Sequence, residues 1–350
     1  MARPHTGSEA SLGKRSVKSI SYLVAVFALG WLCTAYAQAQ SKVRIAQQFG
    51  LSYLPLHAAL ELKLIEKHAK AMGEADVAVE VVRLASGAAV NDAILSGNID
   101  VAMAGLTVLL NLRDKSVGQN LVKGMMAIAD SPIYFNTTDP RIRSVKDFQD
   151  TDRIAMTAGK GTQHAVILQM AAVSAFGWDH RDKLDALAVG ISHPDGVVGL
   201  LSGGGSFKTH ATTVPFIQME LADPRVRTLF TSYDVIGSRH TLIVAYSAER
   251  WRKEAPKLYQ ATFLALSEAM EIIRKDTRGA AEMYLRRESS KLGVDAIHAI
   301  ISDDHMLYFT PTPTGVMAYA NHMARAGLLK NNLTNWKDAF FENVHDMPGN

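Results

Sequence analysis

The sequence has 350 residues, of which 48% are hydrophobic and 20% are charged, and its formal net charge is +3 at pH 7. This composition is typical of a globular protein with enough length for a large core or two lobes. It excludes low-complexity, collagen-like and multi-span membrane proteins.

The first residues of the chain are predicted to be a secretory signal peptide. Lys14, Arg15 and Lys18 precede an apolar run over residues 22–33, and the small-x-small cleavage pattern Ala35-Tyr36-Ala37 follows. Cleavage after Ala39 is the alternative. We therefore predict a signal peptide over residues 1–37 and a periplasmic location for the mature protein.

Two other interpretations of this segment fit less well. A membrane-spanning helix needs about 20 apolar residues, and the run is shorter. A lipoprotein normally carries a small residue before its lipidated cysteine, whereas Leu32 precedes Cys33.

Removal of the leader changes the charge and the cysteine content. The leader carries four of the 37 basic residues and one of the 34 acidic residues, which leaves 33 of each and a net charge of zero. This balance does not indicate binding to nucleic acid or to an anionic membrane. Cys33, the only cysteine, is lost with the leader, so the mature chain has no disulfide, thiolate nucleophile or cysteine metal ligand.

The first part of the mature chain alternates strands with helices. Strands are predicted from apolar alternation and valine-rich runs, and helices from the loops that open them and the glycines that follow them. The predicted strands are 42–46, 77–84 and 100–104, and the predicted helices are 53–70, 88–95 and one that opens at 105–107. This β-α order indicates a parallel sheet with helices on both faces.

A second α/β unit follows, and the chain then becomes mostly helical. In the second unit the predicted strands are 153–156 and 184–189, and the predicted helices are 163–176 and 196–201. A strand over 241–246 is placed to return the chain to the first unit. The remaining predicted helices are 255–275, 279–288, 294–302 and 315–326.

Several segments, in this order and spacing, resemble the nitrate/taurine/alkanesulfonate-type substrate-binding proteins of ABC importers. The resemblance covers residues 41 to about 345. It is carried by the ordered segments Gln47-Gln48-Phe49-Gly50, Leu54-Pro55-Leu56-His57-Ala58-Ala59, residues 93–102 (AILSGNIDVA), Ser144-Val145-Lys146-Asp147-Phe148 and Gly159-Lys160-Gly161-Thr162-Gln163-His164.

The resemblance implies an α/β fold of the periplasmic-binding-protein type II, with two doubly wound α/β lobes joined by two crossing strands. The first lobe would comprise residues 41–130 plus 240–350, and the second lobe residues 135–235. Such a protein clamps a small-molecule anion between its lobes without acting on it as an enzyme. It is expected to be a monomer without a cofactor, and its partners would be an ABC permease and its ATPase.

The sequence departs from the family pattern in the second lobe. Relatives often carry a "G-x-x-D-A" element there, whereas this chain has His210 at the position of the aspartate. The resemblance therefore does not identify a particular ligand.

Three loops that open predicted helices are candidate anion sites, because a helix N-terminus offers unpaired N–H donors and partial positive charge. Their alternative role is ordinary helix capping. The candidate ligand-binding residues in these loops are Ser86, Gly87, Gly105, Thr107, Gly161, Thr162, Gln163 and His164.

Aromatic residues near the predicted cleft favour an organic ligand. Phe49, Leu51, Ser52 and Tyr53 follow the first strand, where their alternative role is a hydrophobic staple on the next helix. Tyr134 and Phe216 are the other two aromatic candidates.

Histidines and one arginine complete the candidates. His164, His210 and His240 are possible donors to a carboxylate or sulfonate, and Arg239 is the best-placed cation for an anion. The alternatives are structural histidines and a surface arginine. No metal site is predicted, because no histidine pair has the tight spacing of metal ligands.

Two other functions stay open at this point. The first is an enzyme on the same fold: the family resembles the thiamine-pyrimidine synthases, which use a cysteine-rich segment that the mature chain lacks, and other small-molecule lyases share the architecture. A sensory protein could instead present the bound ligand to a receptor, and the sequence does not discriminate this role from transport.

Overall fold

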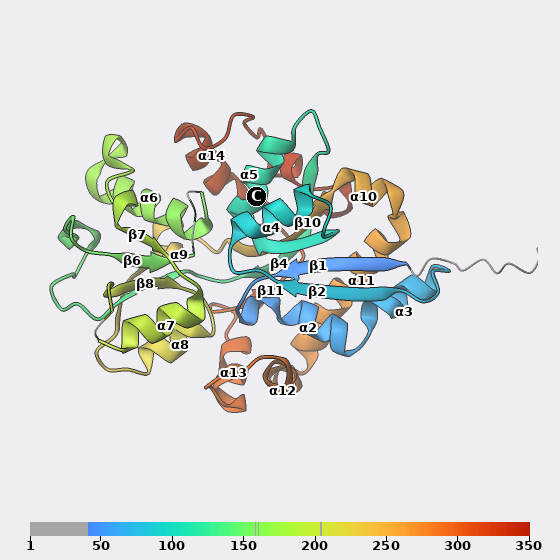
Figure 1. Ribbon diagram of the computed structural model, residues 1–350, viewed down its shortest axis with the longest axis horizontal. Helices are drawn as coiled ribbons and strands as arrows, with labels where there is room; N and C mark the ends of the chain where they lie inside the picture. The colour runs from blue at the N-terminus through green and yellow to red at the C-terminus, as the bar shows by residue number, and fades with distance from the viewer. Residues whose placement is uncertain (1–40, 158, 160, 204) are drawn as a thin grey trace, which may run out of the picture. The chain divides into compact units, whose positions relative to one another are not determined.

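The computed structural model describes residues 41–157, 159, 161–203 and 205–350. The predicted signal peptide and Lys160 therefore lie outside the described residues. Residues 41–350 form one compact unit, which is built around two mixed β-sheets (Figure 1). None of the helices in this described part has the length and apolar character that crossing a membrane requires.

The first sheet has six strands, with parallel pairs on one side and antiparallel pairs on the other. It consists of β1 (Lys42–Gln47), β2 (Ala78–Arg83), β3 (Val101–Gly105), β4 (Val122–Asp130), β10 (Thr241–Ala248) and β11 (Tyr308–Phe309). Their order is β11-β4-β10-β3-β1-β2, and β10 runs antiparallel to β3 and β4. Strands β3, β4 and β10 are buried along nearly their whole length, because helices cover both faces.

The helices that accompany this sheet come from both ends of the chain. They are α2 (Leu54–Glu61), α3 (Leu64–Ala71), α4 (Gly87–Leu95), α5 (Leu106–Ser116), α10 (Glu249–Glu254), α11 (Pro256–Lys275), α12 (Thr277–Arg287), α13 (Val294–Ile301) and α14 (Val316–Arg325). Helix α11 packs on α2 and α3, so the C-terminal helices complete the lobe that the N-terminal strands begin.

The second sheet has five shorter strands. It consists of β5 (Tyr134–Thr137), β6 (Ile154–Met156), β7 (Ala188–Gly190), β8 (Thr209–Thr212) and β9 (Arg227–Thr231), in the order β7-β6-β8-β5-β9. Its helices are α6 (Gln163–Phe176), α7 (His193–Leu201), α8 (Phe216–Leu221) and α9 (Ser232–Ile236). Figure 1 shows these elements grouped together in green and yellow.

Two neighbouring strands carry the chain between the sheets. The chain leaves the first sheet after Asp130 in β4, enters the second sheet at Tyr134, and returns to the first sheet at Thr241 in β10. Asp130 and Thr241 are directly paired. The predicted fold class, two α/β lobes joined by two crossing strands, is thus confirmed, whereas the lobe bounds 41–130 plus 240–350 and 135–235 stay a prediction.

Two local predictions were wrong. The single helix expected over residues 53–70 is broken into α2 and α3, because Lys63 adopts a left-handed backbone conformation with a φ of 52°. The strand expected over residues 184–189 begins only at Ala188, since a 3-10 turn occupies Asp185–Leu187.

A buried carboxyl group lies where the chain crosses between the lobes. Asp130 is 2% exposed, and its carboxylate accepts hydrogen bonds from the hydroxyls of Thr241 at 3.1 Å and Thr314 at 2.9 Å. Burial raises the pKa of Asp130 to about 6, although the two hydroxyl donors and the Arg239 charge oppose this shift. The ionised form of Asp130 is therefore disfavoured at the crossing.

This shift predicts a pH-dependent stability. The unfolded pKa is about 3.9, so the folded state binds more protons between about pH 4 and pH 6, and the free energy of unfolding falls as pH rises through that range. Asp130→Asn cannot ionise, so its free energy of unfolding should not fall in this way. We therefore expect the free energy of unfolding of the variant, minus that of the parent, to rise by roughly 2–3 kcal/mol between pH 4 and pH 7. Urea unfolding at both pH values measures this, with the exposed Asp150→Asn as control. A difference that does not change with pH would contradict the prediction.

Candidate functional site

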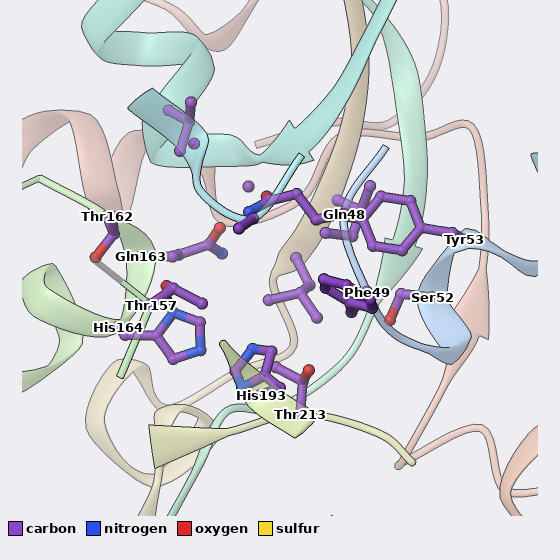
Figure 2. A pocket seen from close by; sticks show the side chains of 16 residues that line it. Gln48, Phe49, Ser52, Tyr53, Thr157, Thr162, Gln163, His164, His193 and Thr213 are labelled. Carbon is purple, nitrogen blue, oxygen red and sulfur yellow. Dashed lines mark hydrogen bonds between the residues drawn. The ribbon is translucent and has the colours of Figure 1, made fainter. Parts of the chain in front are cut away.

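A cavity lies where loops of the two lobes meet, with about 620 Å³ of unfilled space that is partly open to solvent (Figure 2). Its walls come from the loops after β1, β2, β3, β6, β7 and β8 and from the start of β10. The lining residues are Gln48, Phe49, Ser52, Tyr53, Ala85, Gly87, Gly105, Val108, Thr157, Thr162, Gln163, His164, His193, Thr213, Leu242 and Ile243. Ligands of α/β proteins bind beyond the carboxyl ends of strands in this way.

The wall from the first lobe combines aromatic rings with one hydroxyl. Figure 2 shows Phe49, Ser52 and Tyr53 together on this side of the cavity. The Arg83 guanidinium lies 5.0 Å from the centre of the Phe49 ring. Ser52 is buried, and its Oγ has no hydrogen-bond partner among the described residues. This wall can cover an apolar ligand body and offer one free hydroxyl.

Three helices begin at the cavity. Gly87 is the first residue of α4, Gln163 and His164 are the first two residues of α6, and His193 is the first residue of α7. The first N–H groups of a helix have no partner within the helix, and they carry the positive end of its dipole. The three helices come from both lobes, so each lobe directs at least one helix N-terminus at the cavity.

The side chains before these helices act as N-caps. The Ser86 Oγ accepts a hydrogen bond from the Ala89 N–H at 3.3 Å, and the Thr162 Oγ1 accepts one from the Ala165 N–H at 3.4 Å. Sequence analysis gave both residues a possible role as ligand donors, with capping as the alternative. Replacing either would therefore weaken a helix terminus as well as any ligand contact.

Two buried imidazoles form the wall from the second lobe. His164 and His193 are each 6% exposed, and their ring centroids are 5.2 Å apart. The Nδ1 of His164 is 2.9 Å from the Thr157 hydroxyl, while the Nε2 of His164 and the Nδ1 of His193 have no partner among the described residues. Burial lowers the pKa of His164 to about 3 and lowers the pKa of His193 well below its usual value. Both rings are therefore uncharged at neutral pH.

His210 lies behind this pair. Its ring centroid is 5.6 Å from that of His193, and its Nδ1 is 2.5 Å from Glu220 Oε1, with both side chains fully buried. Gly196 of α7 makes room for the ring, since a Cβ at this position would lie only 2.4 Å from it. His210 thus supports His193 and is not among the residues that line the cavity.

Gln163 connects the two lobes. Its Oε1 accepts a hydrogen bond from the Leu106 N–H at 2.9 Å, and its Nε2 donates to the Thr241 carbonyl at 2.8 Å and to the Tyr319 hydroxyl at 3.2 Å. A second amide acts in parallel, because the Asn111 Nδ2 donates to the Gly161 carbonyl at 3.1 Å. The N-terminus of α5 is therefore bonded to the opposite lobe and is less available to a ligand than predicted.

The cavity brings together half of the residues predicted from the sequence. The predicted residues that line it are Phe49, Ser52, Tyr53, Gly87, Gly105, Thr162, Gln163 and His164. Whether they bind a ligand stays a prediction.

Eight other predicted residues lie outside this lining. Leu51, Ser86, Thr107 and Gly161 are neighbours of lining residues in the chain, and Leu51 donates its N–H to the Val214 carbonyl at 3.1 Å. His210 is bonded to Glu220, as described above.

The remaining three have contacts of their own away from the cavity. Phe216 stacks on His193, with ring centroids 5.5 Å apart. The Tyr134 hydroxyl contacts the Met306 sulfur, and the exposed Arg239 covers the Tyr308 ring. His240, the third histidine considered, is bonded to the Ser232 hydroxyl, and burial lowers its pKa to about 4.

Sequence analysis missed His193, Thr157 and Thr213. A signal for His193 was present, because Ser192 and Asp195 frame Pro194 in the pattern of a helix start. Thr213 follows β8, a four-residue strand that is too short to be recognised from its periodicity, whereas Thr157 directly follows the predicted strand 153–156 but was not singled out. The other missed lining residues are Gln48, Ala85, Val108, Leu242 and Ile243.

No protein-family model matches the chain, and no curated protein sequence matches it. Several solved structures, however, match the chain in their fold. The alkanesulfonate-binding protein SsuA from Xanthomonas axonopodis pv. citri, bound to MOPS, has a TM-score of 0.65 at 17% identity, covering 83% of this chain and 95% of that one.

Two further structures are similar to the same extent. The periplasmic aliphatic sulphonate binding protein SsuA from Escherichia coli has a TM-score of 0.63 at 16% identity, covering 87% of this chain and 99% of that one. The periplasmic nitrate-binding protein NrtA from Synechocystis PCC 6803 has a TM-score of 0.66 at 15% identity, covering 85% and 84%. At these identities the likeness establishes the periplasmic-binding-protein fold that the sequence predicted.

The contacts of Gln163 predict that its amide stabilises the closed arrangement. Gln163→Leu keeps the size of the side chain but leaves the buried Leu106 N–H without its partner, so we expect the free energy of unfolding to fall by about 1–3 kcal/mol. We also expect a larger radius of gyration in small-angle X-ray scattering. Gln119→Leu, at an exposed position, is the matched control. Equal stability and radius for both variants would contradict this role.

Proposed function

We propose that this chain is the periplasmic substrate-binding component of an ABC importer, and that its lobes close on a small organic anion. The observation that carries the proposal is the convergence of the N-termini of α4, α6 and α7 on one cavity between the lobes. Such termini bind anions through backbone N–H groups and the helix dipole. The periplasmic-binding-protein fold supports the same reading.

The apolar part of the lining supports an organic ligand. Phe49, Tyr53, Val108, Leu242 and Ile243 surround the polar groups of the two lobes. A cavity that combines apolar walls with convergent polar groups is typical of small-molecule sites. We propose a sulfonate, a carboxylate or a related anion, and this ligand class goes beyond what the fold alone supports.

The mechanism we propose is lobe closure. The hydrogen bonds of Gln163 and the Leu51 N–H to Val214 join residues of opposite lobes, so they require the lobes to be together. A ligand that contacts Phe49 on one side and His193 on the other stabilises this closed arrangement. The permease and its ATPase would then recognise the closed protein, which acts as a monomer secreted by its signal peptide.

We propose binding without catalysis. Among the described residues, no group of three or more histidine, cysteine, aspartate or glutamate side chains is arranged to hold a metal ion. The Ser52 hydroxyl has no base bonded to it there, so it is not activated as a nucleophile.

A thermal unfolding screen of the processed protein tests the proposed function. The panel contains sulfonates, aliphatic and aromatic carboxylates, nitrate and pyrimidine precursors. A ligand at 100 times its dissociation constant should stabilise the protein by about 2.7 kcal/mol, which is visible as a higher melting temperature. We expect an organic anion to produce this shift and to be recovered unchanged. Consumption of the compound would indicate an enzyme, and absence of any shift would count against the proposal.

Ser52 offers a variant that separates binding from folding. Its Oγ is buried without a partner, so Ser52→Ala removes no hydrogen bond of the described protein and should leave the melting temperature without ligand unchanged within about 1 °C. We expect the affinity for the anion found in the screen to fall about three- to tenfold. Ser206→Ala, at an exposed serine outside the cavity, is the control for titration calorimetry. Unchanged affinity in Ser52→Ala would remove this hydroxyl from the site.

A further inference from the structure

The cavity contrasts with most anion sites in its lack of formal charge. None of the described residues that line it is a lysine, arginine, aspartate or glutamate. Arg83 of the first lobe lies over the Phe49 ring and is paired with Glu288. The donors that remain are hydroxyls, side-chain amides, helix N–H groups and the rings of His164 and His193 (Figure 2).

The two imidazoles are held in their uncharged form by their surroundings. His164 is the second residue of α6 and His193 is the first residue of α7, where helix dipoles disfavour a positive ring. The titratable groups that face them are each other and His210, which is bonded to Glu220. Burial is the largest cause of the lowered pKa of both rings, and no described lysine or arginine contributes to it.

These rings still offer hydrogen bonds. The Nε2 of His164 and the Nδ1 of His193 are buried and unpartnered among the described residues, and Figure 2 shows both rings at the cavity wall. A neutral imidazole carries one N–H donor, and hydrogen bonds to a charged acceptor are stronger than those to a neutral one. A buried donor without a partner is costly, so a bound acceptor would satisfy these groups.

The positive potential of the site matches one negative charge. Each helix N-terminus acts like roughly half an elementary charge, but the Asp195 carboxylate in the first turn of α7 offsets that helix, so α4 and α6 together supply about one. A monoanion is balanced by this potential, whereas a dianion would leave buried negative charge uncompensated, at high cost.

We propose that the cavity selects monovalent organic anions, sulfonates or carboxylates, and binds them through uncharged donors only: the rings of His164 and His193, the first N–H groups of α4 and α6, and the N–H of His193 at the start of α7. Binding takes up no proton. This proposal rests on the proposed function, because it specifies how the same site recognises its ligand.

Titration calorimetry with defined probes tests the proposed preference for monovalent anions. The processed protein is titrated with ethanesulfonate and ethylphosphonate at about pH 5.5, 7 and 9, and with propionate at about pH 7. Each titration with the first two compounds is repeated in two buffers of different ionisation enthalpy, which reveals any proton exchanged on binding. Ethanesulfonate stays a monoanion, and we expect its affinity to vary less than about twofold, with no proton exchanged. Ethylphosphonate loses its second proton within this range, and we expect its affinity to fall by about tenfold or more.

Variants of the two histidines test whether their rings donate hydrogen bonds to the anion. His164→Leu and His193→Leu should each weaken ethanesulfonate binding by about tenfold or more, whereas His164→Gln and His193→Gln, which keep an uncharged N–H donor, should stay within about threefold. Circular dichroism and melting temperature identify any variant that fails to fold. In that case the affinities of His164→Gln and His193→Gln are compared with that of the parent. Lys160 lies outside the described residues, so Lys160→Met is included and should leave the affinity within about twofold.

The outcomes separate this proposal from the proposed function. Uptake of about one proton per bound sulfonate, tighter binding of the phosphonate dianion, or loss of binding in Lys160→Met would each indicate a charged donor and overturn the proposal, while the binding function stands. If neither monoanion binds but a neutral compound of the screen does, the proposed preference for monovalent anions is again wrong. If no compound of the screen binds, the proposed function fails as well.

Discussion

The side-chain amide of Gln163 occupies the first N–H of α5 and so limits which helix N-termini are open to the cavity. Its oxygen takes the first N–H of α5, and its nitrogen bonds to the carbonyl of Thr241 in β10, so one residue joins the start of α6 to two elements of the other lobe. With α5 bonded in this way, the free helix termini are those of α4, α6 and α7. The electrostatic character of the site therefore follows from a neutral contact between the lobes.

The histidine wall depends on packing behind it. Phe216 stacks on the outer face of His193, and His210 is fixed by Glu220, whose second oxygen accepts from the Asn136 Nδ2 at 2.9 Å. Gly196 brings α7 close enough for these contacts. Each member of the cluster packs against a neighbour or is bonded to one, and side chains that are held in place lose little entropy when a ligand binds. The departure at His210, where relatives often carry aspartate, thus belongs to the support of the site.

The sequence predicted the parts of the fold that local patterns encode. The valine-rich run of β2 and the Ser-Gly start of α4 have clear local signals. The α/β class followed from the order of such elements, whereas the two-lobed type was implied by the family resemblance. Strand β4 was not predicted, because it is buried on both faces and shows no alternation.

The site was harder to predict than the fold. The loops after predicted strands contain Phe49, Gly87 and His164, which line the cavity, although their role in binding stays a prediction. Sequence alone could not show that Arg239 turns toward Tyr308, or that His193, a member of another element, stacks beside His164. Side-chain direction and contacts between distant elements depend on tertiary packing, which has no local signature.

The energy of closure sets a condition on any ligand of this site. Turning a two-state equilibrium from mostly open to mostly closed requires about 5.5 kcal/mol of preferential binding, whereas a ligand with a dissociation constant of about 1 μM supplies about 8.2 kcal/mol in total. Most of that binding must then come from contacts that exist only in the closed form. The second-lobe donors, at the starts of α6 and α7, meet this condition, because they face the Phe49 wall only when the lobes are together. Under the proposed lobe closure, the contacts of Gln163 must in turn be weak enough to break without ligand, and an uncharged amide suits this position better than an ion pair between the lobes.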